Sequence, residues 1–153
     1  MAVTSTAIDL SLSDNFSEWS SLGSSSPIHP GSKEYSYTKI ASTLQAGRKG
    51  PYTLKPQSFV LAWTAEKVEI PITSRLAARV EGKSSLARLG VGIHVTAPVI
   101  HSGFKGNIQL EMFNFGPHHI VLEPGMWVCQ LVFELTTGTP EKGYQGIFAG
   151  QTA

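Results

Sequence analysis

The chain has 153 residues, with 12 lysines and arginines against 11 aspartates and glutamates, so its formal net charge is +1. This balance gives no indication of a nucleic-acid or membrane partner, although one nucleotide needs only a local basic patch. The length favours a single domain over residues 1–153, large enough to bury a core without disulfides or a structural metal.

Cysteine use and hydropathy narrow the class of protein further. The single Cys129 excludes an internal disulfide and a multi-cysteine zinc site, and we expect it to be a buried thiol in a strand. No apolar run approaches the roughly 18 residues that span a bilayer. The chain also opens without a charged-then-apolar leader, so we expect a cytoplasmic protein.

Period-two alternation of apolar and polar residues predicts several half-buried strands. The first covers Ala7–Leu12, with Ile8, Leu10 and Leu12 facing the core, and a loose loop rich in Ser, Gly and Pro follows over about 17–36. Further strands are expected over 76–81, 107–113 and 127–134; in the last, Trp127, Cys129, Leu131 and Phe133 are expected to point inward.

One short helix is predicted from about Ser84 to Leu89, with Ser84 or Ser85 as N-cap and Gly90 as the stop. The tail, about 136–153, is rich in glycine and is expected to be a flexible arm. Many short strands separated by turn residues favour a sandwich, a jelly roll or a small barrel.

The start of the predicted helix is a candidate anion site. Lys83, Ser84, Ser85 and Arg88 would gather a cation, two hydroxyls, helix N–H groups and a guanidinium at one place. The alternative is an ordinary capped helix with a solvated arginine. The segment is no P-loop, because the glycine-rich approach and the terminal Lys-Ser/Thr pair are missing.

Glu111 is the candidate proton-transfer group. Gln109 and Glu111 share one face of the predicted 107–113 strand, because residues two apart point the same way. If that face lines a pocket, desolvation would raise the pKa of Glu111 towards a value useful in catalysis. The alternative is an exposed strand carboxylate.

The histidines do not indicate a metal site. His118 and His119 are adjacent and would diverge, and His94 is expected to be a strand residue whose ring is tied to a neighbour. His101 follows an apolar residue at a turn and is therefore freer to meet a ligand.

Four segments in order resemble the central block of dCTP deaminases, within the dCTP deaminase/dUTPase superfamily. They are Ser84-Ser85-Leu86-Ala87-Arg88, His94-Val95-Thr96-Ala97, Gly103-Phe104-Lys105-Gly106 and Leu110-Glu111-Met112-Phe113-Asn114. Pro124-Gly125-Met126 and Phe148-Ala149-Gly150-Gln151 match downstream. The resemblance covers most of residues 4–16 and 52–151.

The resemblance implies a mainly β, dUTPase-like distorted jelly roll or β-barrel with one short helix, assembled as a homotrimer with sites at subunit interfaces. Phosphate binding would fall on Lys83, Ser84, Ser85 and Arg88. Ala97 and Gln109 would hold the pyrimidine, His101 could bond the sugar hydroxyl, and Tyr144 and Gln151 on the tail would fold over the triphosphate. Glu111 corresponds to the catalytic carboxylate.

The activity implied is hydrolytic deamination of dCTP to dUTP and ammonia, with Glu111 as the proton shuttle. Magnesium would arrive with the nucleotide, and dTTP is a candidate inhibitor. A zinc deaminase route, signalled by His-x-Glu and Pro-Cys-x-x-Cys, does not suit a chain with one cysteine.

Departures from the family pattern leave two alternatives open. His101 stands where the family usually has an aspartate, Val99 where many deaminases have a basic residue, and Ile147 where many have a phosphate-contacting lysine. The chain is also expected to be a compact variant, without the N-terminal extension typical of these enzymes. One alternative is a dUTP diphosphatase that yields dUMP, which His101 disfavours. The other is a non-catalytic nucleotide-binding regulatory trimer.

Overall fold

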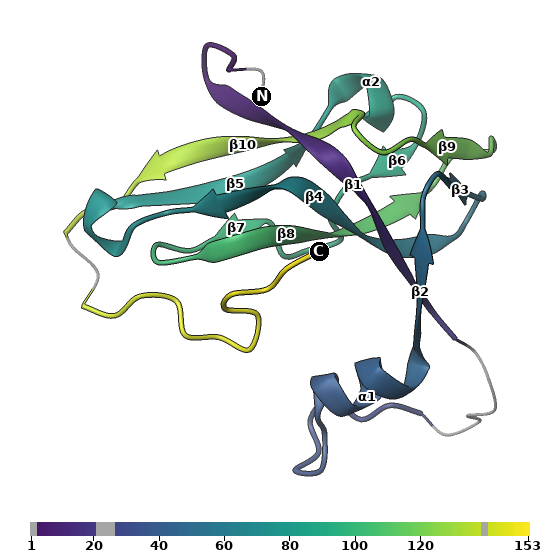
Figure 1. Cartoon of the computed structure of the whole chain (residues 1–153), viewed down its shortest axis with the longest axis horizontal. Helices are drawn as coiled ribbons and strands as arrows, with labels where there is room; N and C mark the ends of the chain where they lie inside the picture. Colours follow the sequence, from purple (N-terminus) through teal and green to yellow (C-terminus); the bar gives the residue numbers. More distant parts are fainter. Residues whose placement is uncertain (1–2, 21–26, 139–140) are drawn as a thin grey trace.

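The computed structural model describes residues 3–20, 27–138 and 141–153, and these build a curled, largely antiparallel sheet (Figure 1). Its strands run in the order β6-β8-β4-β1-β10-β5-β7, with β2 paired to β1, and β3 and β9 form a separate two-stranded sheet. The elements are β1 (Ala7–Trp19), α1 (Tyr37–Leu44), β2 (Gln45–Lys49), β3 (Tyr52–Leu54), β4 (Phe59–Glu69), η1 (Ile72–Ser74), β5 (Leu76–Gly82), α2 (Ser84–Ala87), β6 (Val91–Gly92), β7 (Val99–Ile100), β8 (Lys105–Asn114), β9 (Ile120–Leu122) and β10 (Trp127–Leu135). The predicted mainly β class is confirmed.

Strand β1 joins the two halves of the large sheet. Its first part, Ala7 to Ser11, pairs with β10, and its later part pairs with β4 and β2, with a register shift after Leu10. Leu10 and Leu12 are buried as predicted, but the intervening Asp9 and Ser11 are buried too. The expected alternation is therefore wrong here, because Asp9 and Ser11 face charged partners on neighbouring elements and not solvent.

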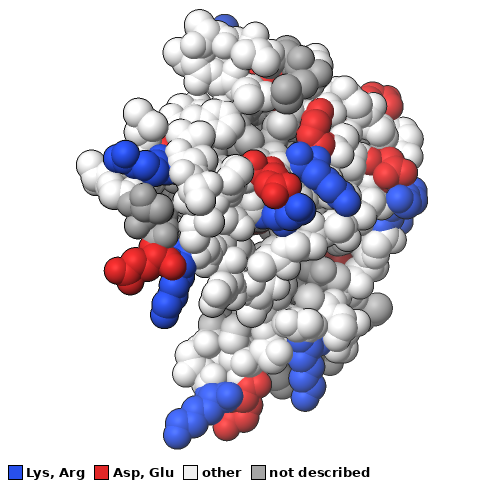
Figure 2. All heavy atoms as spheres, turned by 60° about the vertical axis from the view of Figure 1, so that its left-hand side comes forward, with Lys and Arg blue, Asp and Glu red and all other residues white. Residues whose placement is uncertain are grey.

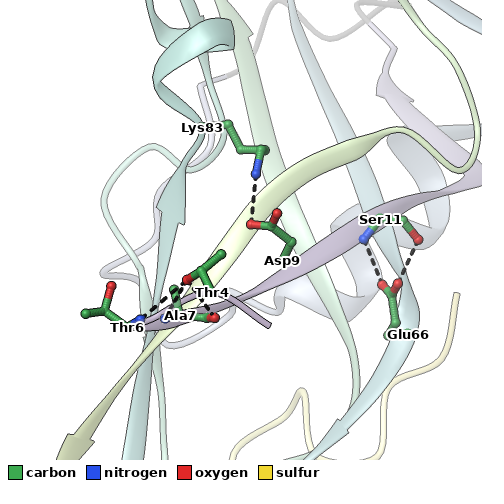
Figure 3. Close-up of polar contacts among 7 residues, drawn as sticks. All are labelled: Thr4, Thr6, Ala7, Asp9, Ser11, Glu66 and Lys83. Carbon is green, nitrogen blue, oxygen red and sulfur yellow. Dashed lines mark hydrogen bonds and ion pairs between the residues drawn. The ribbon is translucent and has the colours of Figure 1, made fainter. Parts of the chain in front are cut away.

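Polar partners compensate the buried polar side chains of β1 (Figure 3). Lys83 Nζ lies 2.8 Å from Asp9 Oδ1, so the buried carboxylate is paired with a cation. The carboxylate of Glu66 accepts hydrogen bonds from Ser11 N at 2.9 Å and from Ser11 Oγ at 2.8 Å. These contacts tie β1 to β4 and to the loop that precedes α2.

The other predicted strands are confirmed, with one correction. In β8 the side chains of Ile108, Leu110 and Met112 are at most 3% exposed, as the alternation predicts. In β10, however, Trp127 and Phe133 are 40% and 38% exposed, so their inward assignment is wrong. Phe133 lies beyond the register with β1, where only β5 still pairs with β10.

The helices differ from the single short one expected. The predicted helix is α2, but its N-cap is Lys83 rather than Ser84 or Ser85, and no side chain caps it. A second helix, α1, was not predicted; the hydroxyl of its N-cap, Ser36, accepts from Lys39 N at 3.4 Å. No helix in the described ranges is long and apolar enough to cross a membrane.

The segments expected to be loose are partly ordered by pairing. β1 continues through Trp19, so residues 17–19 of the expected loop are strand, and residues 21–26 lie outside the described part of the chain. The tail after β10 has no regular secondary structure over 141–153, but it returns along β8 (Figure 1). That 141–153 segment is called the arm below.

Asn114, at the end of β8, provides a stability prediction. Its fully buried side chain donates to the carbonyls of Leu54 at 3.1 Å and His118 at 2.7 Å, and accepts from Gly116 N at 2.9 Å. Asn114→Ala would leave these backbone groups unpaired and should lower the free energy of unfolding by about 2–4 kcal/mol in urea titrations.

Ser58→Ala is the control for this substitution, because it removes one solvent-facing hydrogen bond, from Ser58 Oγ to Lys55 O at 2.7 Å. It should lower the free energy of unfolding by less than about 1 kcal/mol. Equal effects of the two variants would contradict the role given to Asn114.

Candidate active site

A cavity of about 450 Å³ opens between β8, the 94–101 segment, the arm and the start of α1. Its walls are mainly apolar and aromatic, as is usual for sites that bind small molecules. It gathers these residues of the sequence prediction: Ala97, His101, Gln109, Glu111, Tyr144 and Gln151.

Glu111 lies in this cavity because β8 turns its even-numbered side chains into the core and its odd-numbered ones the other way. Burial raises the pKa of Glu111 above its usual range, while a backbone hydrogen bond from Val95 and the nearby His94 act in the opposite direction. Gln109, two residues earlier on the strand, lines the same cavity. The alternative of an exposed strand carboxylate is wrong.

His94 is a cavity residue that sequence reasoning missed. It lies between β6 and β7 and not within a strand, and its buried Nδ1 has no hydrogen-bond partner among the described residues. The expectation that its ring is tied to a neighbour is thus not met at Nδ1. The sequence feature that could have identified His94 as a cavity residue is its place in the His94-Val95-Thr96-Ala97 segment, which runs beside Glu111.

His101 and Tyr144 form one wall of the cavity. Their rings stack with centroids 5.5 Å apart and an interplanar angle of 13°. Tyr144 also contacts Phe104, with 6.2 Å between the two ring centroids. This stack is an aromatic contact between the body of the fold and the arm.

The arm is held along β8 by backbone and side-chain hydrogen bonds. Gln151 accepts from Asn107 N at 3.1 Å and donates its Nε2 to Asn107 O at 2.8 Å. A Cβ atom at Gly106 would lie 2.4 Å from Gln151 O, and one at Gly103 would lie 2.8 Å from Gly143. Both glycines have positive φ, so the Gly103-Phe104-Lys105-Gly106 motif is what permits the arm to approach.

The predicted phosphate residues are not part of this cavity. They lie on α2 and its caps: Lys83 is the N-cap and pairs with Asp9, Ser84 and Ser85 open the helix, and Arg88 is its C-cap. Ser84, Ser85 and Arg88 are exposed. Among the described cavity-lining residues there is no lysine or arginine. A triphosphate seated in the cavity of one isolated chain would therefore lack a cationic side chain.

Charges elsewhere on the described surface are mixed. On the face drawn in Figure 2, blue and red side chains stand in small neighbouring groups. Ion pairs such as Arg79 with Glu134, 2.8 Å apart, and Lys105 with Glu69, 2.9 Å apart, fit this pattern. The face shown offers no broad patch of one sign.

No group of three or more His, Cys, Asp or Glu side chains suited to a metal ion occurs in the described ranges. Cys129 is fully buried, and its burial, with the carboxylates of Glu66 and Asp9, raises the pKa of its thiol to about 12. The prediction that it is a buried strand thiol is confirmed.

Sequence comparison places these features in a family. A family model described as dCTP deaminase-like matches residues 2–136. The dUMP-forming dCTP deaminase of Methanosphaera stadtmanae is 46% identical over 103 residues, which are 67% of this chain and 51% of that protein. The dCTP deaminase of Natronomonas pharaonis is 37% identical over 145 residues, 94% of this chain and 72% of that protein.

Solved structures support the fold. The 2'-deoxycytidine 5'-triphosphate deaminase of Agrobacterium tumefaciens aligns with a TM-score of 0.65 at 19% identity, covering 87% of this chain and 40% of that one. The native EIAV dUTPase aligns with a TM-score of 0.50 at 24% identity, and the alignment covers 63% of this chain and 77% of that one. The chain spans about half the length of the first curated relatives it matches. With its β order, its motifs and this match over most of its length, the chain belongs to the dCTP deaminase-like family.

Proposed function

We propose that this protein deaminates dCTP hydrolytically, with Glu111 as the proton shuttle. The observation that carries the proposal is a carboxylate of raised pKa inside a mainly apolar cavity, beside Gln109 and Ala97. Its relatives named dCTP deaminase give the substrate class. A nucleotide binder without turnover would not need a desolvated carboxylate at this point, because burying a charge costs stability.

The reaction requires three proton transfers, which one carboxylate can perform in turn. A water must lose a proton as it attacks C4 of the cytosine, N3 must gain one, and the departing amine must be protonated. Desolvation of Glu111 brings the pKa of the carboxylic acid closer to neutrality, where both its acid and base forms are accessible. Magnesium is expected to enter with the triphosphate and to reduce its charge.

The absence of cations among the described lining residues supports a site shared between copies of the chain. The pyrimidine would lie against Ala97 and Gln109, while Ser84, Ser85 and Arg88 of a neighbouring copy would bind the phosphates. Ser84 and Ser85 open α2 and Arg88 follows its last residue, and all three side chains are exposed, so another chain can reach them. A homotrimer, as the resemblance implies, is the assembly we propose.

The product is proposed to be dUTP, with dUMP as the competing outcome. His101 provides no carboxylate to orient a second water for attack on phosphate, and its ring is stacked on Tyr144. Several relatives are nevertheless named dUMP-forming, which favours a second hydrolytic step at the same site. Chromatography of the products of dCTP turnover distinguishes the two outcomes, because only the second hydrolytic step yields dUMP and pyrophosphate.

Glu111→Gln should reduce kcat for ammonia release by several orders of magnitude, because the amide cannot shuttle protons. The variant should remain folded, with a Tm no lower than that of the wild type, because it removes a desolvated charge. The assay is dCTP with magnesium, read by ammonia release and nucleotide chromatography.

Glu123→Gln, at an exposed turn position, is the matched control and should keep wild-type turnover. If Glu111→Gln retains more than a tenth of the wild-type rate, Glu111 is not the shuttle. If the wild type binds dCTP without turnover, the protein is a nucleotide-binding regulator instead.

The pH dependence of kcat/KM follows from the raised pKa of Glu111. The carboxylate form that accepts a proton from water is lost as pH falls through that pKa, so activity should fall on the acid side at a pH above the ordinary range for glutamate. A pH–rate profile from about pH 4 to 9 tests this. An acid limb at the ordinary glutamate pKa would show that burial does not tune this group.

Arg88→Ala should weaken dCTP binding by about tenfold or more, because a charge-assisted phosphate contact is lost. Mixing this variant with Glu111→Gln tests the shared site. In trimers reassembled at random from equal amounts of the two variants, about a quarter of the sites combine an intact Glu111 from one chain with an intact Arg88 from its neighbour, so about a quarter of wild-type activity should return. Absence of recovery would place both residues in one chain's site.

A further inference from the structure

Two aromatic residues outside the motifs that carry the family resemblance also reach the cavity. Trp19 is the last residue of β1 and Tyr37 the first residue of α1, and both line the cavity. They are joined edge to face, with ring centroids 6.3 Å apart and an interplanar angle of 77°. Neither was predicted as a site residue.

The arm adds a third ring to this pair. Phe148 packs on Tyr37 with centroids 5.3 Å apart and an interplanar angle of 80°, and it lines the same cavity. Trp19 and Phe148 are 37% and 39% exposed, so the row of three rings lies where the cavity meets solvent. We call Trp19, Tyr37 and Phe148 the aromatic rim.

Local structure holds Tyr37 in place without help from the arm. The Oγ of Ser36 caps the helix, and Gln45 Nε2 donates to the hydroxyl of Tyr37 at 3.4 Å. Residue Gln45 opens β2, which pairs with β1 opposite Trp19. Trp19 and Tyr37 therefore form a fixed wall against which Phe148 of the arm can rest.

Apolar contacts are the main source of binding energy that this cavity offers to a nucleoside. Its described lining has no lysine or arginine. Aromatic rings can bind the flat face of a base and the sugar without any charge. Within one chain, retention of the nucleoside part of the ligand then depends on the rings and on closure of the arm.

We propose that the aromatic rim is a nucleotide-binding element: Trp19 and Tyr37 contact the nucleoside part of the bound pyrimidine nucleotide, and Tyr37 holds Phe148 and the arm across it. The rim thus makes α1 part of the substrate site. This inference rests on the proposed function for the identity of the ligand, but its contacts are independent of Glu111 and of the chemical step.

The affinity for dCTP, measured by calorimetry with magnesium present, tests the binding role. Tyr37→Ala removes the central ring and should raise Kd by about tenfold, while Tyr37→Phe keeps the ring and should stay within about twofold of the wild type. Tyr35→Ala is the matched control, because Tyr35 is 37% exposed, lies two residues away and does not line the cavity.

Closure of the arm is tested without nucleotide by limited trypsin digestion, following the Lys142–Gly143 bond by mass spectrometry. Lys142 is an exposed residue of the arm, next to the stacked Tyr144. Tyr37→Ala and Phe148→Ala should each accelerate cleavage several-fold, and the double variant should cleave no faster than the quicker single one, because both remove the same contact.

The outcomes separate the rim from the catalytic proposal. If Tyr37→Ala binds dCTP as tightly as Tyr35→Ala, the rim is not a binding element, whatever the activity. If the accelerations of trypsin cleavage by Tyr37→Ala and Phe148→Ala multiply in the double variant, the two residues do not act through one shared contact, and the proposed closure of the arm by Tyr37 and Phe148 is wrong. If the wild type binds dCTP through the rim but releases no ammonia, the deaminase assignment fails and the rim stands.

Discussion

Asn107 connects the bulge of β4, the start of β8 and the arm, and the site depends on these connections. Its buried Nδ2 donates to the carbonyls of Thr64, Ala65 and Glu66 at 2.9, 3.3 and 3.2 Å, across the register shift between β4 and β8. Its backbone exchanges hydrogen bonds with Gln151. These contacts supplement the hydrogen bond from Thr64 Oγ1 to Glu66 O at 2.9 Å, so carbonyls at the register shift find donors, and the backbone contacts with Gln151 hold the arm along β8.

The electrostatics of the site separate two tasks that the proposed triphosphate substrate would need. The cavity is apolar, which raises the pKa of Glu111 and suits it to proton transfer. The same apolar lining cannot neutralise phosphates, and the exposed Arg88 lies instead at α2. Placing the two groups on different parts of the fold lets each keep its own environment, and it makes association of chains the natural way to combine them.

Membership in the dCTP deaminase-like family does not fix how the arm closes. Here the contact at His101 is a stack on Tyr144, and a second contact joins Phe148 to Tyr37. Both attach the arm through rings rather than through charges, so closure does not require the phosphates of a ligand. The glycines at 103 and 106 make room for this, because their φ values of 85° and 152° and the nearby backbone leave no space for a side chain.

The sequence by itself determined the strand character of β8, the short α2 and the shared face of Gln109 and Glu111, because these follow from local periodicity and from the turn chemistry at a helix end. Only the tertiary structure decided what covers each face. Asp9 is buried, Trp127 is exposed, and the α2 residues lie away from the cavity, since each outcome depends on strands that are distant in sequence. The aromatic rim could not be predicted from the sequence either, because its rings are 18 and 111 residues apart and meet only after β1 has paired with β2 and the arm has bonded to β8.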